Sequence, residues 1–512
     1  MVRFLLNDTP VSLSSAEANQ TILQFLRETR GLTGTKEGCA AGDCGACTVV
    51  LAELSSCQQR LHYAPINSCI ALLSSLHLKQ LICVEHLSDH QQLHPVQQAL
   101  VEHHGSQCGF CTPGFVMSMF ALYHNTDVVK RHDVEYALSG NLCRCTGYRP
   151  IIDAALSVCN NVVADNFKAQ QATTISALLA LRSSVDAPLK QLTKNNSIQT
   201  ANKDNPAING AGLLMPTSRE ALQHCIKKYP DAPLVAGSTD VSLTITQQFR
   251  HYPTLISLAQ IAELKTIVHT QTLVKIGAAC TLDDLHRLCC KYYPTLTELI
   301  ERFASLPVRK QATLGGNLVN ASPIGDLPPL MLALKARFII DNGAEQRTVA
   351  ARNFYTGYRE TALPKGFWLS CIELPLLQPD QHLAAYKVSK RFEDDISAVC
   401  AAFIVTADNQ HNITALSTGF GGVAATPAVA LDFEQHMAGH NLLDTQSLKH
   451  AKQCLADTFS PINDVRASAL YRQQLVANLW HRFVLQYQNQ TLEKIPDKIH
   501  NKQIATRVRY HA

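Results

Sequence analysis

Two groups of cysteines constrain the fold of this chain more than any other feature. Eight of the 18 cysteines form two groups of four, all before residue 146, and the other ten are scattered. Met1–Thr9 shows no long apolar segment followed by a small-residue cleavage site, so we expect a protein of the reducing cytoplasm. Grouped thiols in that compartment indicate metal or redox centres rather than disulfides.

The first group has the spacing of a plant-type iron–sulfur loop. Cys39, Cys44 and Cys47 follow the pattern C-x4-C-x2-C, and a more distant cysteine would complete the set. The loop is rich in glycine and alanine, which lets backbone N–H groups approach the sulfurs. We interpret it as a 2Fe–2S site rather than a zinc site, because zinc favours pairs of cysteines. Cys57 and Cys69 compete as the fourth ligand, and Cys69 is preferred because it opens an apolar run.

The second group combines two short motifs from separate loops. Cys108 and Cys111 form C-x2-C, and Cys143 and Cys145 form C-x-C. Four helices are expected within residues 94–160, and in an up-down bundle both loops lie at the same end. The spacing alone fits zinc and 2Fe–2S equally well. The neighbouring iron–sulfur site favours a second 2Fe–2S cluster, because two clusters in series connect distant redox centres.

Composition excludes several other classes of protein. Apolar residues make up 46% of the chain and charged residues 17%, which is enough apolar material for packed cores. The net charge is +4 with no concentrated block of lysine and arginine, so no nucleic-acid partner is expected. The sequence has no run of about 20 apolar residues, so no membrane-spanning helix is expected. The 21 histidines show no recognisable metal spacing.

The pattern of elements predicts several domains of mixed type. A hairpin and a helix over Thr21–Arg30 are expected near the N-terminus. Thr112 and Pro113 are expected to cap and open one of the four bundle helices. The polar region after residue 162 is interpreted as a solvated linker, with Ile175–Arg182 as its one helical part. Alternating strands and helices follow, and a last α+β unit starts near Leu383.

Two turns of small residues in the second half could hold a phosphate group. Leu234–Val241 is predicted to be a strand that ends in such a turn, where successive N–H groups can face a pyrophosphate. Thr313–Asn317 is a second turn, with paired glycines. No G-x-G-x-x-G lies between a strand and a helix, so a Rossmann dinucleotide site is not supported.

Five segments together resemble the molybdenum hydroxylase family, and within it the xanthine dehydrogenases. They are Gly34–Thr48, His104–Gly114, Gly140–Pro150, Leu314–Asp326 and Glu393–Ser397. The likeness covers about residues 1–160 and 206–490. It departs from the family at Ala40 and Ala41, where a glycine and an acidic residue are common. The resemblance implies the separate iron–sulfur/flavin small subunit of a bacterial split enzyme.

The resemblance also implies a multidomain α+β architecture. The implied domains are a β-grasp 2Fe–2S ferredoxin domain over 1–85, a four-helix 2Fe–2S domain over 86–162, a linker over 163–205, a vanillyl-alcohol-oxidase-type FAD-binding domain over 206–382, a C-terminal α+β flavoprotein domain over 383–490 and a tail over 491–512. It supports both cluster assignments. The implied ligands are Cys39, Cys44, Cys47 and Cys69, then Cys108, Cys111, Cys143 and Cys145.

Cofactor contacts follow from the same resemblance. Both small-residue turns would hold the FAD diphosphate. The implied FAD contacts are Leu234, Val235, Ala236, Gly237, Ser238, Thr239, Asp240, Val241, Phe303, Thr313, Leu314, Gly315, Gly316, Asn317, Asp326, Leu369 and Lys387. Gln107 would face the molybdopterin of the partner subunit. Phe354–Arg359 resembles the loop near the nicotinamide site of NAD-dependent members, which favours NAD as acceptor.

The implied function is electron transfer within a purine-hydroxylating oxidoreductase. Electrons from hypoxanthine or xanthine would pass from molybdenum on a large subunit through both clusters to FAD and NAD. No residue here would act as acid or base on the purine, and a dimer of heterodimers is expected. Two alternatives remain at this stage. One is a related enzyme for aldehydes or other N-heterocycles, and the other is a non-catalytic iron–sulfur redox sensor.

Overall fold

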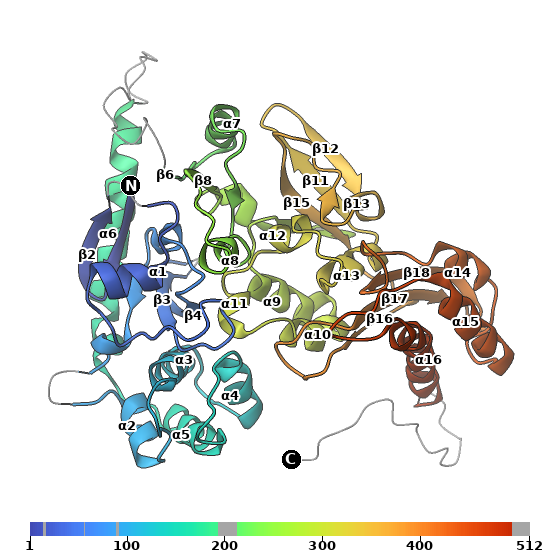
Figure 1. Cartoon of the computed structure of the whole chain (residues 1–512), viewed down its shortest axis with the longest axis horizontal. Helices are drawn as coiled ribbons and strands as arrows, with labels where there is room; N and C mark the ends of the chain where they lie inside the picture. The colour runs from blue at the N-terminus through green and yellow to red at the C-terminus, as the bar shows by residue number, and fades with distance from the viewer. Residues whose placement is uncertain (14–16, 56, 89–91, 193–211, 494–512) are drawn as a thin grey trace. The chain divides into compact units, whose positions relative to one another are not determined.

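The computed structural model describes residues 1–13, 17–55, 57–88, 92–192 and 212–493 (Figure 1). They form two compact units. The first contains residues 1–262, 281–283 and 304–312, and the second contains the other described residues. No described helix combines the length and the apolar character that crossing a membrane requires.

The first unit begins with a five-stranded mixed sheet. Its order is β2-β1-β5-β3-β4, with β1 and β5 parallel and the other three pairs antiparallel. Its strands are β1 (Val2–Leu6), β2 (Thr9–Leu13), β3 (Thr48–Leu54), β4 (Leu61–Asn67) and β5 (Gln80–Ile82). The predicted N-terminal hairpin is therefore confirmed. Short 3₁₀ turns cover Leu73–Leu76 and Val84–His86.

The helix predicted over Thr21–Arg30 is present in altered form. It consists of one α-turn, α1 (Ile22–Gln24), and a wider π-turn, η1 (Phe25–Thr29). Oγ1 of Thr21 accepts from the Gln24 amide, and the Gln24 side chain accepts from the Thr21 amide, which closes a capping box. The helical segment packs against the sheet in one core. A mixed sheet that holds a helix in this way is the β-grasp arrangement that the resemblance implied.

Four helices follow, as predicted. They are α2 (Pro95–Glu102), α3 (Thr112–Asn125), α4 (Arg131–Leu138) and α5 (Arg149–Cys159). The expected role of Thr112 as helix cap is wrong, because Thr112 is the first helical residue and Cys111 occupies the cap position. Ten successive residues of α3 are buried, since this helix packs on its neighbours and on the β-grasp sheet.

The linker prediction is wrong over most of its length. Residues Asn166–Leu192 form one long helix, α6, and residues 193–205 lie outside the described residues. Ile175, Leu178 and Leu181 recur at three-residue intervals and therefore share a face. Leu178 is fully buried in the core of the helical domain, with Phe167 and Ile175 packed against it. The apolar stripe was hidden in a polar composition, which favoured a linker.

Asp165 joins three helices at the start of α6. Its Oδ1 accepts from the Lys168 amide, so it caps α6. Its Oδ2 lies 2.9 Å from Nε2 of His94 and 3.0 Å from Nε2 of His124, and all three side chains are nearly completely buried. Nδ1 of His94 accepts from the Val96 amide and caps α2. His94 therefore carries its proton on Nε2 and donates it to Asp165.

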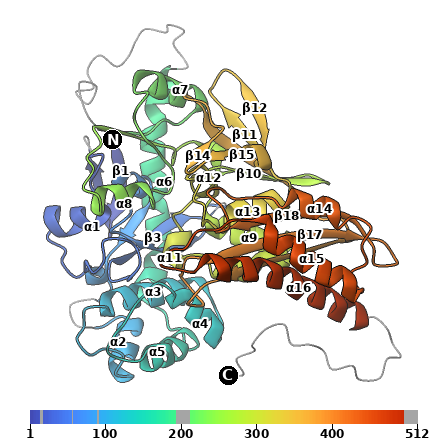
Figure 2. The same cartoon turned by 45° about the vertical axis from the view of Figure 1, so that its right-hand side comes forward.

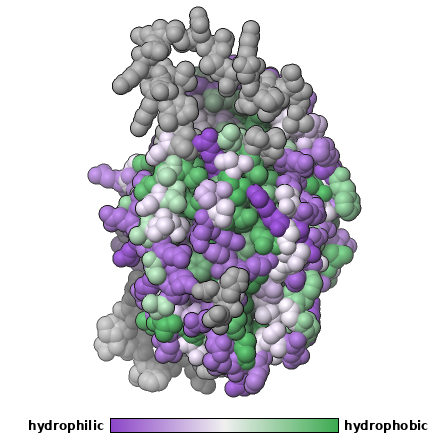
Figure 3. Space-filling model, turned by 90° about the vertical axis from the view of Figure 1, so that its left-hand side faces the viewer, coloured by the Kyte–Doolittle hydropathy of each residue, from purple (hydrophilic) through white to green (hydrophobic). Residues whose placement is uncertain are grey.

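The first unit ends with a small parallel sheet of order β6-β8-β7. Its elements are β6 (Gly212–Leu214), α7 (Arg219–Lys228), β7 (Leu234–Val235), α8 (Val241–Thr246) and β8 (Thr254–Ser257), and α11 (Leu306–Arg309) joins them from later in the chain. Among the coloured residues of Figure 3, hydrophobic and hydrophilic side chains intermix over the face shown, so this face presents no continuous apolar surface.

The second unit contains a five-stranded antiparallel sheet of order β12-β11-β15-β10-β9. Its strands are β9 (Ile267–His269), β10 (Leu273–Gly277), β11 (Arg337–Asp341), β12 (Gln346–Ala350) and β15 (Trp368–Pro375). A hairpin of β13 (Tyr355–Gly357) and β14 (Glu360–Thr361) lies between β12 and β15 in sequence. The helices of this region are α9 (Leu282–Tyr292), α10 (Thr297–Glu301), α12 (Leu314–Val319) and α13 (Leu327–Ala333), with 3₁₀ turns at Ala262–Lys265, Pro294–Leu296 and Ala351–Asn353.

A three-stranded antiparallel sheet completes the second unit. It consists of β16 (Gln381–Val388), β17 (Val399–Ala407) and β18 (Ile413–Gly421), in that order. Its helices are α14 (Leu431–His436), α15 (Thr445–Thr458) and α16 (Ala469–Glu493), seen beside the sheet in Figures 1 and 2. The middle strand β17 is buried over seven successive residues because α13 also contacts it. The start of the predicted tail, 491–493, is still helical, and 494–512 lie outside the described residues.

Candidate functional site

The first cysteine group converges in the first unit. Cys39, Cys44 and Cys47 lie on the loop before β3, and Cys69 lies just after β4. The Sγ atoms of Cys47 and Cys69 are 3.3 Å apart, and both residues are buried. Hydrogen bonds with Cys44 and Cys69 hold the pKa of the Cys39 thiol well below its usual range, and the same bonds raise the pKa of Cys44 and Cys69. The four sulfurs fit a cluster because they converge on one place.

Backbone geometry around these sulfurs explains the small residues of the loop. A Cβ on Gly38 would lie 2.8 Å from Sγ of Cys44, which leaves room for glycine alone. The Ala41 amide donates to Sγ of Cys39 at 3.4 Å. Ala40, one of the two departures from the family pattern, lies in the left-handed region with φ +52°. The loop therefore keeps its wrapped backbone without the usual glycine.

The second cysteine group also converges, at the predicted end of the helical bundle. Sγ of Cys145 lies 3.7 Å from Sγ of Cys108, and Cys111 hydrogen-bonds to Cys143. Burial alone would raise the pKa of Cys143, but hydrogen bonds from the side chain of Thr146 and from the amides of Cys145 and Thr146 lower it to about 7. All four thiols offer sulfur to one small volume, as a cluster requires.

The two cysteine groups are joined by hydrogen bonds between their loops. The Leu142 amide, next to Cys143, donates to the carbonyl oxygen of Cys44 at 3.0 Å. Asn141 extends the contact, because its Nδ2 donates to the Gly45 carbonyl oxygen at 3.1 Å. Oγ of Ser118 donates to Oδ1 of Asn141 at 2.7 Å and fixes the orientation of that amide. The joint is buried at Asn141 and is part of the first unit.

Glycines make this close approach possible. A Cβ on Gly114 would lie 2.1 Å from the carbonyl oxygen of Gly45, and a Cβ on Gly45 would lie 2.3 Å from that of Gly140. Gly45 also needs its freedom for a φ of +68°. Three backbones therefore stack between the two cysteine groups without side chains between them.

The second cysteine group lies at the surface of the first unit. Cys108 and Cys145 are exposed, and so is Gln107. Large apolar side chains surround them with unusual exposure: Phe110 is 48% exposed, Leu142 41% and Tyr148 36%. Apolar groups gathered around a redox site are typical of a surface that another protein covers.

The first small-residue turn, Leu234–Val241, is bound to the first cysteine group. Oγ of Ser238 donates to the carbonyl oxygen of Ile70, the residue after Cys69. A Cβ on Gly237 would lie 2.0 Å from the carbonyl oxygen of Gln311, so the turn fits tightly against the backbone that follows α11. The side-chain oxygen of Gln311 is buried and has no hydrogen-bond partner, and this fits a site that awaits a ligand.

Two residues missed by sequence reasoning strengthen this connection. Oγ1 of Thr246, the last residue of α8, donates to the Ala40 carbonyl oxygen at 2.8 Å. Nε2 of Gln247 donates to the carbonyl oxygens of Cys39 and Ala40, at 3.2 and 3.0 Å. These bonds span more than 200 residues of sequence, so no local signal could have revealed them.

The second small-residue turn, Thr313–Asn317, lies in the second unit. Oγ1 of Thr313 accepts from the Gly316 amide at 3.1 Å and starts α12. A Cβ on Gly315 would lie 2.6 Å from the carbonyl oxygen of Ala278, so this turn is pressed onto the strand end after β10. Oδ1 of Asn317 is buried without a hydrogen-bond partner, which again fits a polar ligand.

Three predicted flavin residues meet in the second unit. Nζ of Lys387 lies 2.5 Å from Oδ2 of Asp326, and both side chains are almost fully buried. The same ammonium lies 5.9 Å from the centre of the Phe303 ring. Oγ of Ser397 donates to the other carboxylate oxygen of Asp326 at 2.5 Å, a role that sequence reasoning missed. Leu369 is buried on β15, where it pairs with Ile340.

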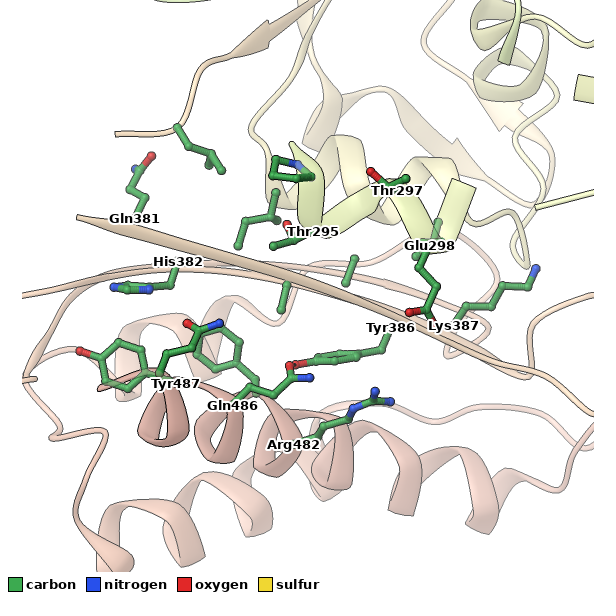
Figure 4. A pocket seen from close by; sticks show the side chains of 18 of the residues that line it. Thr295, Thr297, Glu298, Gln381, His382, Tyr386, Lys387, Arg482, Gln486 and Tyr487 are labelled. Carbon is green, nitrogen blue, oxygen red and sulfur yellow. The ribbon is translucent and has the colours of Figure 1, made fainter. Parts of the chain in front are cut away.

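Two further features lie in the second unit. On the Phe354–Arg359 loop, Phe354 is buried against Phe338, whereas Tyr358 is 64% exposed and available to a ligand. A cavity of about 780 Å³ runs along β16, with Lys387 among its lining residues (Figure 4). The Arg482 guanidinium lies 4.8 Å from the centre of the Tyr386 ring, and the Tyr386 hydroxyl donates to Gln486. The cavity is thus both aromatic and polar.

Four segments of the chain match known domain families. They are a 2Fe-2S iron-sulfur cluster binding domain (residues 4–74), a second 2Fe-2S binding domain (83–156), an FAD binding domain in molybdopterin dehydrogenase (208–377) and a CO dehydrogenase flavoprotein C-terminal domain (384–487). Both cysteine groups, with all eight predicted cluster ligands, and both small-residue turns fall inside these matches.

Similar proteins agree with these domains. The xanthine dehydrogenase of Emericella nidulans is 32% identical over 94% of this chain and 38% of its own length, and the xanthine dehydrogenase/oxidase of Gallus gallus is 31% identical over 86% and 36%. The chain thus spans just over a third of these relatives. Among solved structures, a cyanide-inactivated Cu,Mo-CO dehydrogenase has a TM-score of 0.50 and 26% identity, covering 53% of this chain and 95% of its own. Quinoline 2-oxidoreductase from Pseudomonas putida 86 has a TM-score of 0.50 and 25% identity, covering 54% and 96%.

Two 2Fe–2S domains followed by an FAD-binding domain define this chain as an iron–sulfur flavoprotein. The chain belongs to the molybdenum hydroxylase family and corresponds to its iron–sulfur and FAD-binding portion.

Proposed function

We propose that this chain is the electron-transfer subunit of a xanthine dehydrogenase, an oxidoreductase that passes electrons from hypoxanthine or xanthine to NAD. The single observation that carries the proposal is the buried joint between the two cysteine groups, where the Leu142 amide donates to the Cys44 carbonyl oxygen. A redox sensor needs no such joint, whereas a relay needs its two centres held at a fixed short separation. The purine substrate is favoured because the similar proteins named xanthine dehydrogenase align along most of the chain.

Within this proposal the cysteines hold the clusters. Cys39, Cys44, Cys47 and Cys69 would bind one, and Cys108, Cys111, Cys143 and Cys145 the other. Bound clusters would carry electrons singly, and a bound flavin would take them up one at a time and give them up as a pair, so the protein sets distance and orientation. Ser238, Thr246 and Gln247 bind backbone oxygens of the first cluster loop and keep the first flavin turn against it.

The flavin residues have separate roles in the two units. In the first unit, Gly237 lets the backbone of its turn approach that of Gln311, and in the second, Thr313 shapes the turn that carries Asn317. Asp326 and Lys387 form a buried ion pair beside Phe303, which would present a fixed polar edge to the flavin. We also propose the domain boundaries predicted from the sequence, except that α6 replaces most of the linker.

The exposed second cysteine group would meet the partner. The apolar side chains of Phe110, Leu142 and Tyr148 would pack against a molybdopterin-binding large subunit, and exposed Gln107 would reach its pterin. Covering this surface removes apolar area from water and brings the outermost sulfurs closest to the partner's redox centre. The whole assembly would be a dimer of heterodimers.

The test combines the metal-loaded chain with its partner. The chain isolated without oxygen should contain four irons and one FAD, and should reduce a dye with NADH on its own. With a molybdopterin-binding large subunit present, xanthine should bleach the clusters and reduce NAD. Cys108→Ser should abolish the xanthine reaction and Cys290→Ser, at another exposed cysteine, should preserve it. Zinc in place of iron would refute the relay, and bleaching by an aldehyde but not a purine would refute the substrate.

A further inference from the structure

Three histidines form a compact cluster in the second unit, and none of them belongs to the cysteine groups or flavin residues discussed above. His436 ends α14, His440 lies in the following turn, and His450 lies on α15. One ring nitrogen from each of the three lies within 4.8 Å of those of the other two. Figures 1 and 2 both show α14 and α15 side by side, and this packing brings the rings together.

The separation of the rings suits a metal ion. Nε2 of His436 lies 3.3 Å from Nδ1 of His450. Two imidazole nitrogens bound to one tetrahedral zinc ion, each about 2.0–2.1 Å from it, lie about 3.4 Å apart. The rings of His440 and His436 have centres 5.5 Å apart, so His440 can supply a third nitrogen. His436 and His440 are four residues apart, and the turn after the end of α14 brings the His440 ring back beside that of His436.

The nearby carboxylates are already engaged. Asp444 accepts hydrogen bonds from the amides of Gln446 and Ser447 and caps α15. Glu434 accepts from the amide and hydroxyl of Thr418. Among the described residues, the only hydrogen-bond partner of the His436 and His450 side chains is each other. The Asp444 carboxylate lies near His440, but among the described residues no ion pair engages the three imidazoles, which leaves them suited to share a cation.

The backbone under the cluster is held in place before any ion binds. The Gly439 amide donates to the Ile413 carbonyl oxygen at 2.8 Å, and the Ile413 amide donates to the His440 carbonyl oxygen at 2.9 Å. Phe433 on α14 and Ala451 on α15 are completely buried in the core beneath. Ligands on elements that are already fixed lose little conformational freedom on binding.

We propose that His436, His440 and His450 form a binding site for a divalent transition metal ion, with zinc as the expected occupant. Imidazole ligands suit zinc, copper and nickel rather than magnesium or calcium. His436 and His450 are exposed and His440 is half-buried, so the fourth coordination position opens to solvent. The site does not depend on the proposed electron-transfer function, and it would fasten α14 to α15.

Calorimetry with zinc chloride tests this site on the full chain with its clusters and FAD bound. We expect the unaltered chain to bind one zinc ion. The control variant His224→Ala, which changes an exposed histidine of α7, should bind one zinc ion with the same affinity. His450→Ala should weaken binding by about 100-fold or more, because loss of a bond that merely supports a metal ligand already costs about 10–100-fold. His436→Gln is the second variant and should give the same loss.

X-ray absorption at the zinc edge distinguishes this site from capture by free cysteines, and the irons do not interfere with it. Nitrogen neighbours at about 2.0–2.1 Å support the proposal, whereas sulfur neighbours at about 2.3 Å overturn it. Binding that is unchanged in both histidine variants, or absent from the unaltered chain, also overturns it. The visible spectrum of the clusters should be the same in all variants, which checks that each one is folded.

Discussion

The joint between the two cysteine groups can be tested by adding a single methyl group. In Gly114→Ala the new Cβ would lie 2.1 Å from the Gly45 carbonyl oxygen, about 1.3 Å closer than ordinary contact at 3.4 Å. Gly45 cannot retreat, because it is itself packed against the carbonyl oxygen of Gly140. The helix α3 and the loop of the first cysteine group must therefore move apart.

The expected loss of stability follows from two opposing effects. Overpacking costs about 1–3 kcal/mol, and backbone atoms that cannot turn aside place this site in the upper part of that range. Alanine in α3 gains about 1 kcal/mol over glycine in helix propensity. The net loss is therefore about 1–2 kcal/mol. Gly212→Ala is the matched control, because Gly212 has nothing within 4 Å of its added Cβ.

Cluster absorbance followed through urea without oxygen measures this loss in the first unit. Both tryptophans, Trp368 and Trp480, belong to the second unit, so their fluorescence should keep its midpoint in the same samples. Electron paramagnetic resonance of the reduced protein should also show weaker magnetic coupling between the clusters. A Gly114→Ala protein with the midpoint and coupling of the Gly212→Ala control would refute the role given to this glycine.

Three other changes test separate parts of the structure. Lys387→Met leaves Asp326 buried without its cation, so we expect a loss of about 3–5 kcal/mol in tryptophan-monitored unfolding and poor flavin retention; an unchanged midpoint would contradict the ion pair. Burial raises the pKa of Asp165, but two imidazoles outweigh it and hold that pKa well below its usual range. The ionised carboxylate therefore adds to the free energy of unfolding. This contribution is complete above the pKa of about 3.9 that the group has in the unfolded chain, and it is lost as the pH falls through the lower pKa of the folded protein. Asp165→Asn should lower the free energy of unfolding by about 1.5–3 kcal/mol near neutral pH, measured by circular dichroism. If the difference in stability between the unaltered chain and the variant does not shrink in acid, the ionisation of Asp165 does not contribute to stability as proposed. Cys69→Ser should lose the first cluster, while Cys57→Ser, at an exposed thiol, should retain four irons. The reverse result would show that Cys57, and not Cys69, is the fourth ligand.

Features encoded over short stretches of sequence were predictable. The spacing of Cys39, Cys44 and Cys47 indicated a loop around one centre, and the hairpin expected near the N-terminus is present. Four helices were expected in the second domain and four are present. Each of these signals depends on residues within a few turns of one another, where local chemistry decides the backbone.

Features that depend on distant residues were not predictable. Ser397 reaches Asp326 across 71 positions, and Thr246 reaches Ala40 across 206. The apolar stripe of α6 was obscured by polar neighbours, so composition suggested a linker. The cluster of His436 and His440 is completed by a ligand on another helix, which is why spacing alone did not reveal it.

The bond between Leu142 and Cys44 also bears on how the cofactors are installed. This bond ties the backbone of each loop to that of the other, and metal binding is coupled to folding of the site that receives it. Filling one site therefore favours the backbone arrangement that the other requires. During maturation, chains with both clusters or with neither should outnumber those with a single one, and damage to either should release its neighbour.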